Sequence, residues 1–143
     1  QPNKIWVLDN LNSTLHLLSL NNLRQSQVVR NLRGVLDLNN ITQIRERNNR
    51  LFLLDKSKGV YVFDLYATLI EFIPGESIQQ LDAFEGTLFT VSDKTVYVRS
   101  LITGEQFSIE LPIDGVYEVN YRNQFFYFRS KGNVHKYELQ FSK

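Results

Sequence analysis

Residues 50 to 65 read RLFLLDKSKGVYVFDL, and this pattern of an apolar run, a polar turn and a second apolar run recurs along the chain. The other copies are KIWVLDNLNSTLHLLSL at 4 to 20, TLFTVSDKTVYVRSL at 87 to 101 and QFFYFRSKGNVHKYEL at 124 to 139. The leading apolar residues of the last three copies, Leu51, Leu88 and Phe125, are spaced 37 and 37 residues apart. A regular period of this length is typical of repeat architectures.

Each copy is predicted to be a β-hairpin. Its first run is almost continuously apolar, as in Leu51 to Leu54, which is typical of a strand that is covered on both faces. The turns between the runs are rich in Asp, Asn, Ser and Gly, which tolerate positive φ or cap the turn locally. Further short strand signals before and after the hairpins predict a four-stranded meander, which has the size of one propeller blade.

The predicted fold is therefore all-β, a partial β-propeller of about four antiparallel four-stranded blades with a repeat of about 37 residues. We expect a single propeller segment over residues 1–143, with blades at roughly 4–33, 41–74, 78–112 and 115–141. The first hairpin lacks a preceding strand and the last lacks a following one, which predicts two complete and two incomplete blades. An open arc exposes strand edges, so we expect upstream sequence, a second chain or a partner to complete the ring.

The segment LFLLDKSKGVYVFDLYATLIEF at 51 to 72 resembles one NHL-type propeller repeat, with Ser57 to Gly59 and Ala67 in place of the usual Asn-Arg and Gly. Together with KIWVLDNLNSTLHLLSLNN, it is similar to poorly characterised extracytoplasmic six-bladed propeller proteins of Bacteroides-type bacteria. The chain looks like the C-terminal part of such a protein. The resemblance implies a location in the periplasm, the outer membrane or the cell surface, and it implies no particular activity.

Composition excludes several classes of function. Sixteen basic and fifteen acidic residues leave a net charge of +1, so no overall field attracts nucleic acid, an anionic membrane or an acidic substrate. The absence of Cys excludes disulfides and thiolate sites. No G-x-S-x-G, P-loop, H-E-x-x-H or EF-hand calcium motif occurs, and we predict neither an enzyme nor a cofactor.

Two pairs of polar residues recur at equivalent places in the repeat. His16 and His135 fall in one column with Tyr61 and Tyr97, which favours packing with a polar tip over metal binding. Asp9 and Asp55 follow the first strand of their hairpins, where they are predicted to cap the turns. In the other two copies this place is assigned to Ser92 and Arg129.

The innermost strand of each blade is expected to present polar residues to a central channel. The candidate channel or partner-binding residues are Arg45, Arg47, Asp82, Asn120 and Arg122, with Tyr117 and Tyr121 nearby. Arginine forks favour an anion or an acidic partner segment as the guest. Replacement of Arg45 and Arg122 by Ala is expected to weaken such binding and to leave the fold intact.

Three functional hypotheses follow. The favoured one is a non-enzymatic protein-interaction or scaffold propeller in an extracytoplasmic assembly, whose partner is another chain or missing blades. The alternative is an extracytoplasmic ligand-binding or hydrolytic propeller with its site at the channel mouth. A weaker alternative is an RNA-binding module, suggested by the basic residues Arg24, Arg30 and Arg33. No apolar run approaches the roughly 20 residues that a transmembrane helix needs.

Overall fold

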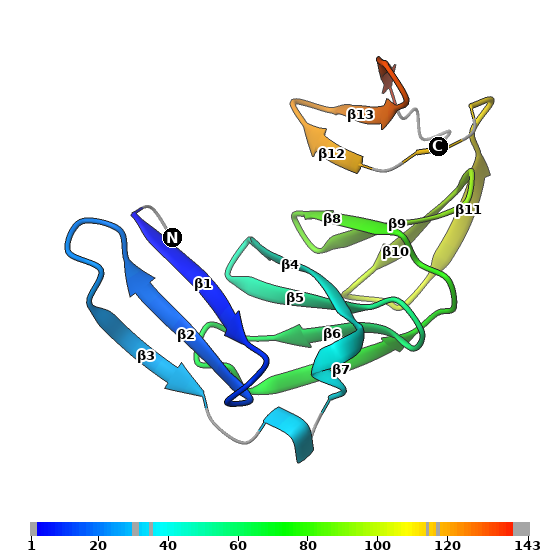
Figure 1. Cartoon of the computed structure of the whole chain (residues 1–143). Coiled ribbons are helices and arrows are strands. Elements are labelled where there is room, and N and C mark those ends of the chain that lie inside the picture. Colours follow the sequence, from blue (N-terminus) through cyan, green and yellow to red (C-terminus); the bar gives the residue numbers. More distant parts are fainter. Residues whose placement is uncertain (1–2, 30–31, 35, 114, 117, 139–143) are drawn as a thin grey trace.

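The computed structural model describes residues 3–29, 32–34, 36–113, 115–116 and 118–138 as four successive antiparallel sheets (Figure 1). We call these sheets blades 1 to 4 in chain order. Blade 1 contains β1 (Lys4–Asp9), β2 (Thr14–Ser19) and β3 (Gln25–Val29). Blade 2 contains β4 (Ile41–Arg47), β5 (Arg50–Asp55), β6 (Gly59–Phe63) and β7 (Leu69–Pro74).

Blade 3 contains β8 (Gln80–Phe84), β9 (Thr87–Ser92), β10 (Thr95–Ser100) and β11 (Gln106–Glu110). Blade 4 contains β12 (Glu118–Arg122), β13 (Phe125–Ser130) and β14 (Asn133–Glu138). The only helical turns among the described residues are two short 3-10 turns at Leu32–Gly34 and Leu38–Asn40. No described helix is long and apolar enough to cross a membrane.

The all-β prediction, with two complete and two incomplete blades, is confirmed. Blades 2 and 3 have four strands each, and blades 1 and 4 have three within the part of the chain that is described. Among the described strands, blade 1 has no counterpart of the inner strand β4, and blade 4 has no counterpart of the outer strand β7. The third strand of blade 1, β3, spans Gln25–Val29, and the insertion after it contains the 3-10 turns.

Strand register gives an exact correspondence between the four hairpins. In each hairpin we start from the paired residues that flank the turn and move two residues back along the first strand. The residue reached there and its partner on the second strand form one equivalent pair per blade. These pairs are Val7 with His16, Leu53 with Tyr61, Thr90 with Tyr97, and Phe128 with His135. The predicted column of two histidines and two tyrosines is therefore confirmed.

The fourth repeat is displaced by one residue from the alignment that the sequence favoured. The same counting places Phe126, not Phe125, in the column of Leu51 and Leu88, so the second spacing is 38 residues. A one-residue slip turns every side chain of a strand to the opposite face. The structure buries Phe126 and Phe128 between blades, whereas the favoured alignment would have buried Phe125.

The apolar core consists of three clusters, each between two successive blades. The cluster between blades 1 and 2 includes Leu15, Leu51, Leu53, Tyr61 and Phe63. The next includes Phe52, Leu54, Val60, Val62, Leu81 and Leu88, and the third includes Phe89, Val91, Val98, Val119, Phe126 and Phe128. Alternate residues of β5 thus pack against blade 1 and blade 3, which explains why Leu51 to Leu54 are all apolar and all buried.

Replacement of Phe126 by Ala is expected to lower the free energy of unfolding by about 3–5 kcal/mol, because it empties a ring-sized space between blades 3 and 4. Phe126 is 3% exposed and packs edge-on against Phe89 with ring centroids 4.6 Å apart. Phe107→Ala is the control, since Phe107 is 45% exposed, and a loss below about 1 kcal/mol is expected there. Urea denaturation followed by circular dichroism measures both values, and equal losses would contradict the register described above.

Candidate functional site at the inner rim

The inner strands β4, β8 and β12 lie next to one another, with β8 in contact with both others. We call their polar side chains the inner rim. Register places Arg45, Asp82 and Asn120 at the same position in three successive blades, since they pair with Phe52, Phe89 and Tyr127 respectively. The three blades therefore present a cation, an anion and an amide at equivalent places.

Asp82 is the centre of the inner rim and is completely buried. Its Oδ1 lies 2.9 Å from Arg45 Nη1, accepts a hydrogen bond from Arg47 Nε at 3.1 Å and accepts the backbone N–H of Ala83 at 2.8 Å. Its Oδ2 accepts the backbone N–H of Tyr121 at 2.7 Å. One carboxylate thus joins β4, β8 and β12.

Further polar contacts extend from Asp82 to the face of blade 4. Arg45 Nη1 donates to Asn120 Oδ1 at 3.2 Å, and Asn120 Nδ2 donates to Glu118 Oε1 at 2.9 Å. Glu118 Oε2 lies 3.4 Å from Arg129 Nε. A continuous series of contacts therefore links Asp82 through Arg45, the neutral amide of Asn120 and Glu118 to Arg129 of β13.

A second connection between β4 and β8 lies two residues before Arg45. The side-chain amide of Gln43 donates to the carbonyl of Leu81 at 3.1 Å and accepts the N–H of the same residue at 3.0 Å. Gln43 and Glu118 were absent from the sequence-based candidates. The signal that would have found them is their shared column, because they pair with Leu54 and Arg129, which are equivalent residues of β5 and β13.

Four of the five predicted channel residues, Arg45, Arg47, Asp82 and Asn120, come together in the structure. Arg122 does not join them, and its guanidinium carbon lies 5.2 Å from the ring centroid of Tyr127. The role proposed for these residues in binding a partner or anion stays a prediction. Tyr117, also named as a neighbour of the channel, lies outside the described residues, as does Arg30 of the suggested RNA-binding cluster.

Arg45 is largely committed to the fold. Its side chain is 17% exposed and faces a carboxylate that is completely buried, so its removal would leave Asp82 with less compensation for its buried charge. The expectation that Arg45→Ala leaves the fold intact stays a prediction, and the ion pair with buried Asp82 argues against it. A sequence identifies the charged residues of a strand, but not which of them pair with each other across two blades.

The two histidines make local hydrogen bonds. Thr14 Oγ1 lies 2.8 Å from His16 Nε2, and Ser130 Oγ lies 2.8 Å from His135 Nε2. Tyr61, in the same column, packs on Phe72 with ring centroids 4.7 Å apart. Among the described residues, no three His, Asp or Glu side chains converge as metal ligands.

The hairpin caps confirm the prediction for Asp9 and Asp55. Asp55 Oδ1 accepts from the backbone and hydroxyl of Ser57 at 2.8 and 2.7 Å. Hydrogen bonds from the side chain and then the backbone of Asn12 hold the pKa of Asp9 below its ordinary value. The equivalent residue in blade 4 is Ser130, which ends β13 and pairs with Asn133, so the assignment of Arg129 to this place was wrong.

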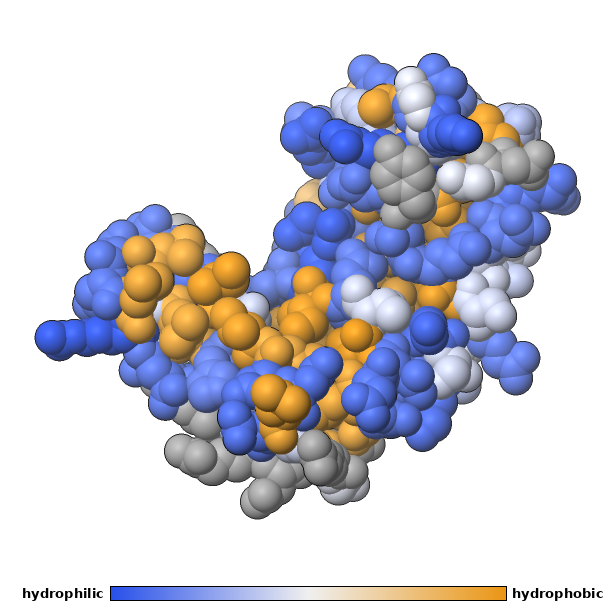
Figure 2. Space-filling view, in the orientation of Figure 1, coloured by the Kyte–Doolittle hydropathy of each residue, from blue (hydrophilic) through white to orange (hydrophobic). Residues whose placement is uncertain are grey.

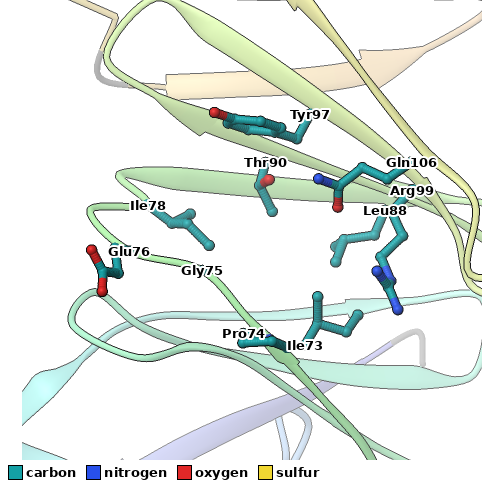
Figure 3. Close-up of a pocket in the computed structure, with 10 residues that line it drawn as sticks. All are labelled: Ile73, Pro74, Gly75, Glu76, Ile78, Leu88, Thr90, Tyr97, Arg99 and Gln106. Carbon is teal, nitrogen blue, oxygen red and sulfur yellow. The ribbon is translucent and has the colours of Figure 1, made fainter.

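A cavity of about 160 Å³ lies between blades 2 and 3, away from the inner rim (Figure 3). Its apolar lining includes Ile73, Ile78 and Leu88, and its polar lining includes Thr90, Tyr97, Arg99 and Gln106. Arg99 Nε is buried without a hydrogen-bond partner, while Nη2 lies 3.5 Å from Glu71 Oε1. Sequence reasoning missed this cavity, although Arg99 shares its column with Phe63 and Tyr137 and is the only charged residue there.

No family model matches this sequence, and no curated protein matches it. Solved structures do match, and one is the WD40 domain of Neurospora crassa Pan2, with a TM-score of 0.70 at 10% identity over 96% of this chain and 44% of that chain. The fold is that of a β-propeller. At this level of identity the likeness concerns the fold alone.

Two further structures extend the comparison. The computationally designed protein Ika4 matches with a TM-score of 0.66 at 11% identity, over 98% of this chain and 88% of that chain. The glutaminyl cyclase of Myxococcus xanthus matches with a TM-score of 0.63 at 14% identity, over 92% of this chain and 60% of that chain. This protein therefore corresponds to only part of the length of the Pan2 domain and of the cyclase.

Replacement of Asp82 by Ala is expected to lower the free energy of unfolding by about 3–5 kcal/mol, because Arg45 and the N–H of Tyr121 lose a buried acceptor. Arg47→Ala is the matched control at the same carboxylate. Its side chain is 42% exposed, so a loss below about 1 kcal/mol is expected. Urea denaturation measures both, and a small loss for Asp82→Ala would show that the inner rim does not fasten the blades.

Proposed function

We propose that this protein is a non-enzymatic interaction module, a propeller arc that works by packing against another protein or against further propeller blades. The observation that carries the proposal is that blade 1 presents an apolar sheet face against which no other described part of the chain packs. Ile5 and Val7 are 46% and 38% exposed, whereas Leu51 and Leu53, which occupy the same columns in blade 2, are 0% exposed. Apolar β-sheet faces of this kind are typical of protein interfaces.

The inner rim supports the same function. Its central carboxylate already accepts four hydrogen bonds or ion-pair contacts from this chain, and its two arginines face that carboxylate. A catalytic acid or base needs an open position beside a reacting group. Asp82 offers none, so the inner rim is better suited to holding inner strands together than to chemistry.

An extracytoplasmic setting is part of the proposal. It is supported by the resemblance of residues 51 to 72 to NHL-type repeats of envelope proteins, and a chain without Cys is compatible with an oxidising compartment. In such a setting the module would serve as a scaffold within an envelope or cell-surface assembly.

The isolated chain is expected to bind the dye ANS and to associate reversibly as its concentration rises, because the apolar face of blade 1 is uncovered. The double variant Ile5→Lys and Val7→Lys is expected to sediment as a monomer, with ANS fluorescence reduced several-fold and thermal stability unchanged. Val134→Lys is the control, since Val134 is 61% exposed on the opposite end of the arc. A wild-type chain that stays monomeric and binds no ANS would remove the basis of the proposal.

Ligand binding is a second candidate function, and the cavity between blades 2 and 3 favours it over the channel mouth. A buried Arg99 Nε without a partner, beside apolar Ile73 and Leu88, suits a small aliphatic carboxylate. Butyrate is therefore expected to bind measurably by calorimetry, and Arg99→Ala is expected to abolish the binding. Arg50→Ala, an exposed arginine outside this cavity, serves as the control. Equal heats for the wild type and Arg99→Ala would exclude this site.

A further inference from the structure

The two ends of the arc differ in chemistry. We propose that blade 1 docks a further β-propeller blade of different sequence through its outward face, whereas blade 4 closes the arc with a polar cap. This inference rests on the proposed interaction function and specifies where and with what the module packs. Figure 2 shows apolar atoms gathered over the position of β1, and mainly hydrophilic atoms over β12 and β13.

The outward face of blade 1 occupies the columns that face the preceding blade in the other blades. It consists of Ile5, Val7, His16 and Leu18. Their equivalents are Leu51, Leu53, Tyr61 and Phe63 in blade 2, and Phe126, Phe128, His135 and Tyr137 in blade 4. In both of those blades the apolar and tyrosine members of this set pack against the preceding blade, as part of the interblade cores. Blade 1 therefore carries a blade-binding face whose counterpart is absent from the described residues.

The outward face of blade 4 departs from the corresponding columns. On blades 1 to 3, the side facing the following blade carries Trp6, Leu8, Leu15 and Leu17, then Phe52, Leu54, Val60 and Val62, then Phe89, Val91, Val96 and Val98. Blade 4 has Tyr127, Arg129, Val134 and Lys136 at these places. Two charged residues thus replace Leu or Val where every other blade is apolar.

The charges on this face are satisfied within blade 4. Lys136 Nζ lies 4.0 Å from the ring centroid of Phe125, and Arg129 pairs with Glu118 at 3.4 Å. Arg122 covers the ring of Tyr127. Covering these residues with an apolar sheet would remove Arg129 and Lys136 from water without supplying new partners, which is costly. A polar outer face is the usual property of a terminal capping repeat.

This asymmetry identifies the chemistry of the occupant. A second copy packed head to tail would place the charged face of its blade 4 against Ile5 and Val7, which is a poor match. The suitable partner is a blade whose exposed side carries apolar residues like those of blades 1 to 3. It would also supply an inner strand. In blade 2, β5 pairs with the inner strand β4 on one edge, and β1 is the equivalent of β5 in blade 1. The corresponding edge of β1 pairs with none of the described strands.

The chain itself offers a probe with the required face. Lys4 occupies the column of Thr87, because both pair with the last residue of the next strand, Ser19 and Ser100. A copy of residues 41–86 can therefore be joined directly before Lys4, which adds a copy of blade 2 and of the inner strand β8 in register. This N-terminal addition is expected to unfold together with the chain in one transition, with a urea m-value increased by about a quarter or more, and to remove most of the ANS fluorescence.

The matched control adds a blade at the other end. Glu138 occupies the column of Ser100, so residues 65–111 can follow Glu138 and supply an outer strand and a copy of blade 3. This C-terminal addition is expected to leave the m-value of the main transition unchanged, because its apolar face meets Arg129 and Lys136. The same addition carrying Arg129→Leu and Lys136→Val is expected to dock and to raise the m-value.

The outcomes separate the two proposals. An N-terminal addition that leaves the m-value unchanged would overturn blade docking at blade 1, even if the chain alone still associates and binds ANS. Equal docking at both ends without the two substitutions would overturn the polar cap. Failure of the interaction function itself would appear earlier, as a wild-type chain that neither associates nor binds ANS.

Discussion

A β-sheet with two apolar faces needs another part of the protein packed against each face, and this requirement governs the architecture of the protein. Strands in the middle of blades 2 and 3, such as β5, β6 and β9, send alternate side chains to the preceding and the following blade, as Leu53 and Leu54 do. Burial of apolar area supplies the main stabilisation, at about 25 cal/mol per Å². Because no blade can bury both faces alone, the blades stack radially, and stability is a property of interfaces rather than of single sheets.

Polar contacts at the inner rim address a different problem. Inner strands converge toward one axis, and apolar packing alone does not determine how far one blade slides along the next. Asp82 accepts hydrogen bonds from side chains of β4 and from the backbone of β12, and these bonds are directional. The same column holds Arg45 and Asn120 in the adjacent blades, so one equivalent position carries side chains that complement each other in successive blades. The repeat places Arg45, Asp82 and Asn120 at equivalent positions, and their different residue types allow them to pair.

The fold was largely predictable because its signals are local and repeated. Continuous apolar runs, polar turns and a period near 37 residues indicated blades, and the column shared by His16 and His135 held in the structure. The displacement of the fourth repeat was not predictable in the same way, because residues 125 to 128, Phe-Phe-Tyr-Phe, form an unbroken aromatic run in which either register looks apolar. Only the packing of Phe126 against blade 3 distinguishes the two registers.

The candidate site shows where sequence reasoning stops. Polar positions that alternate with core residues on an inner strand are visible in the sequence, and four of them do meet. Whether a charge faces solvent or another charge depends on contacts between residues up to 75 positions apart, such as Arg45 with Asn120. Once register is known, however, comparison of equivalent columns becomes more informative than any motif. It separates residues that are apolar in every blade, such as Leu51 and its counterparts Ile5, Leu88 and Phe126, from the exceptions, Arg129 and Lys136, whose charges distinguish the end of the arc from its interior.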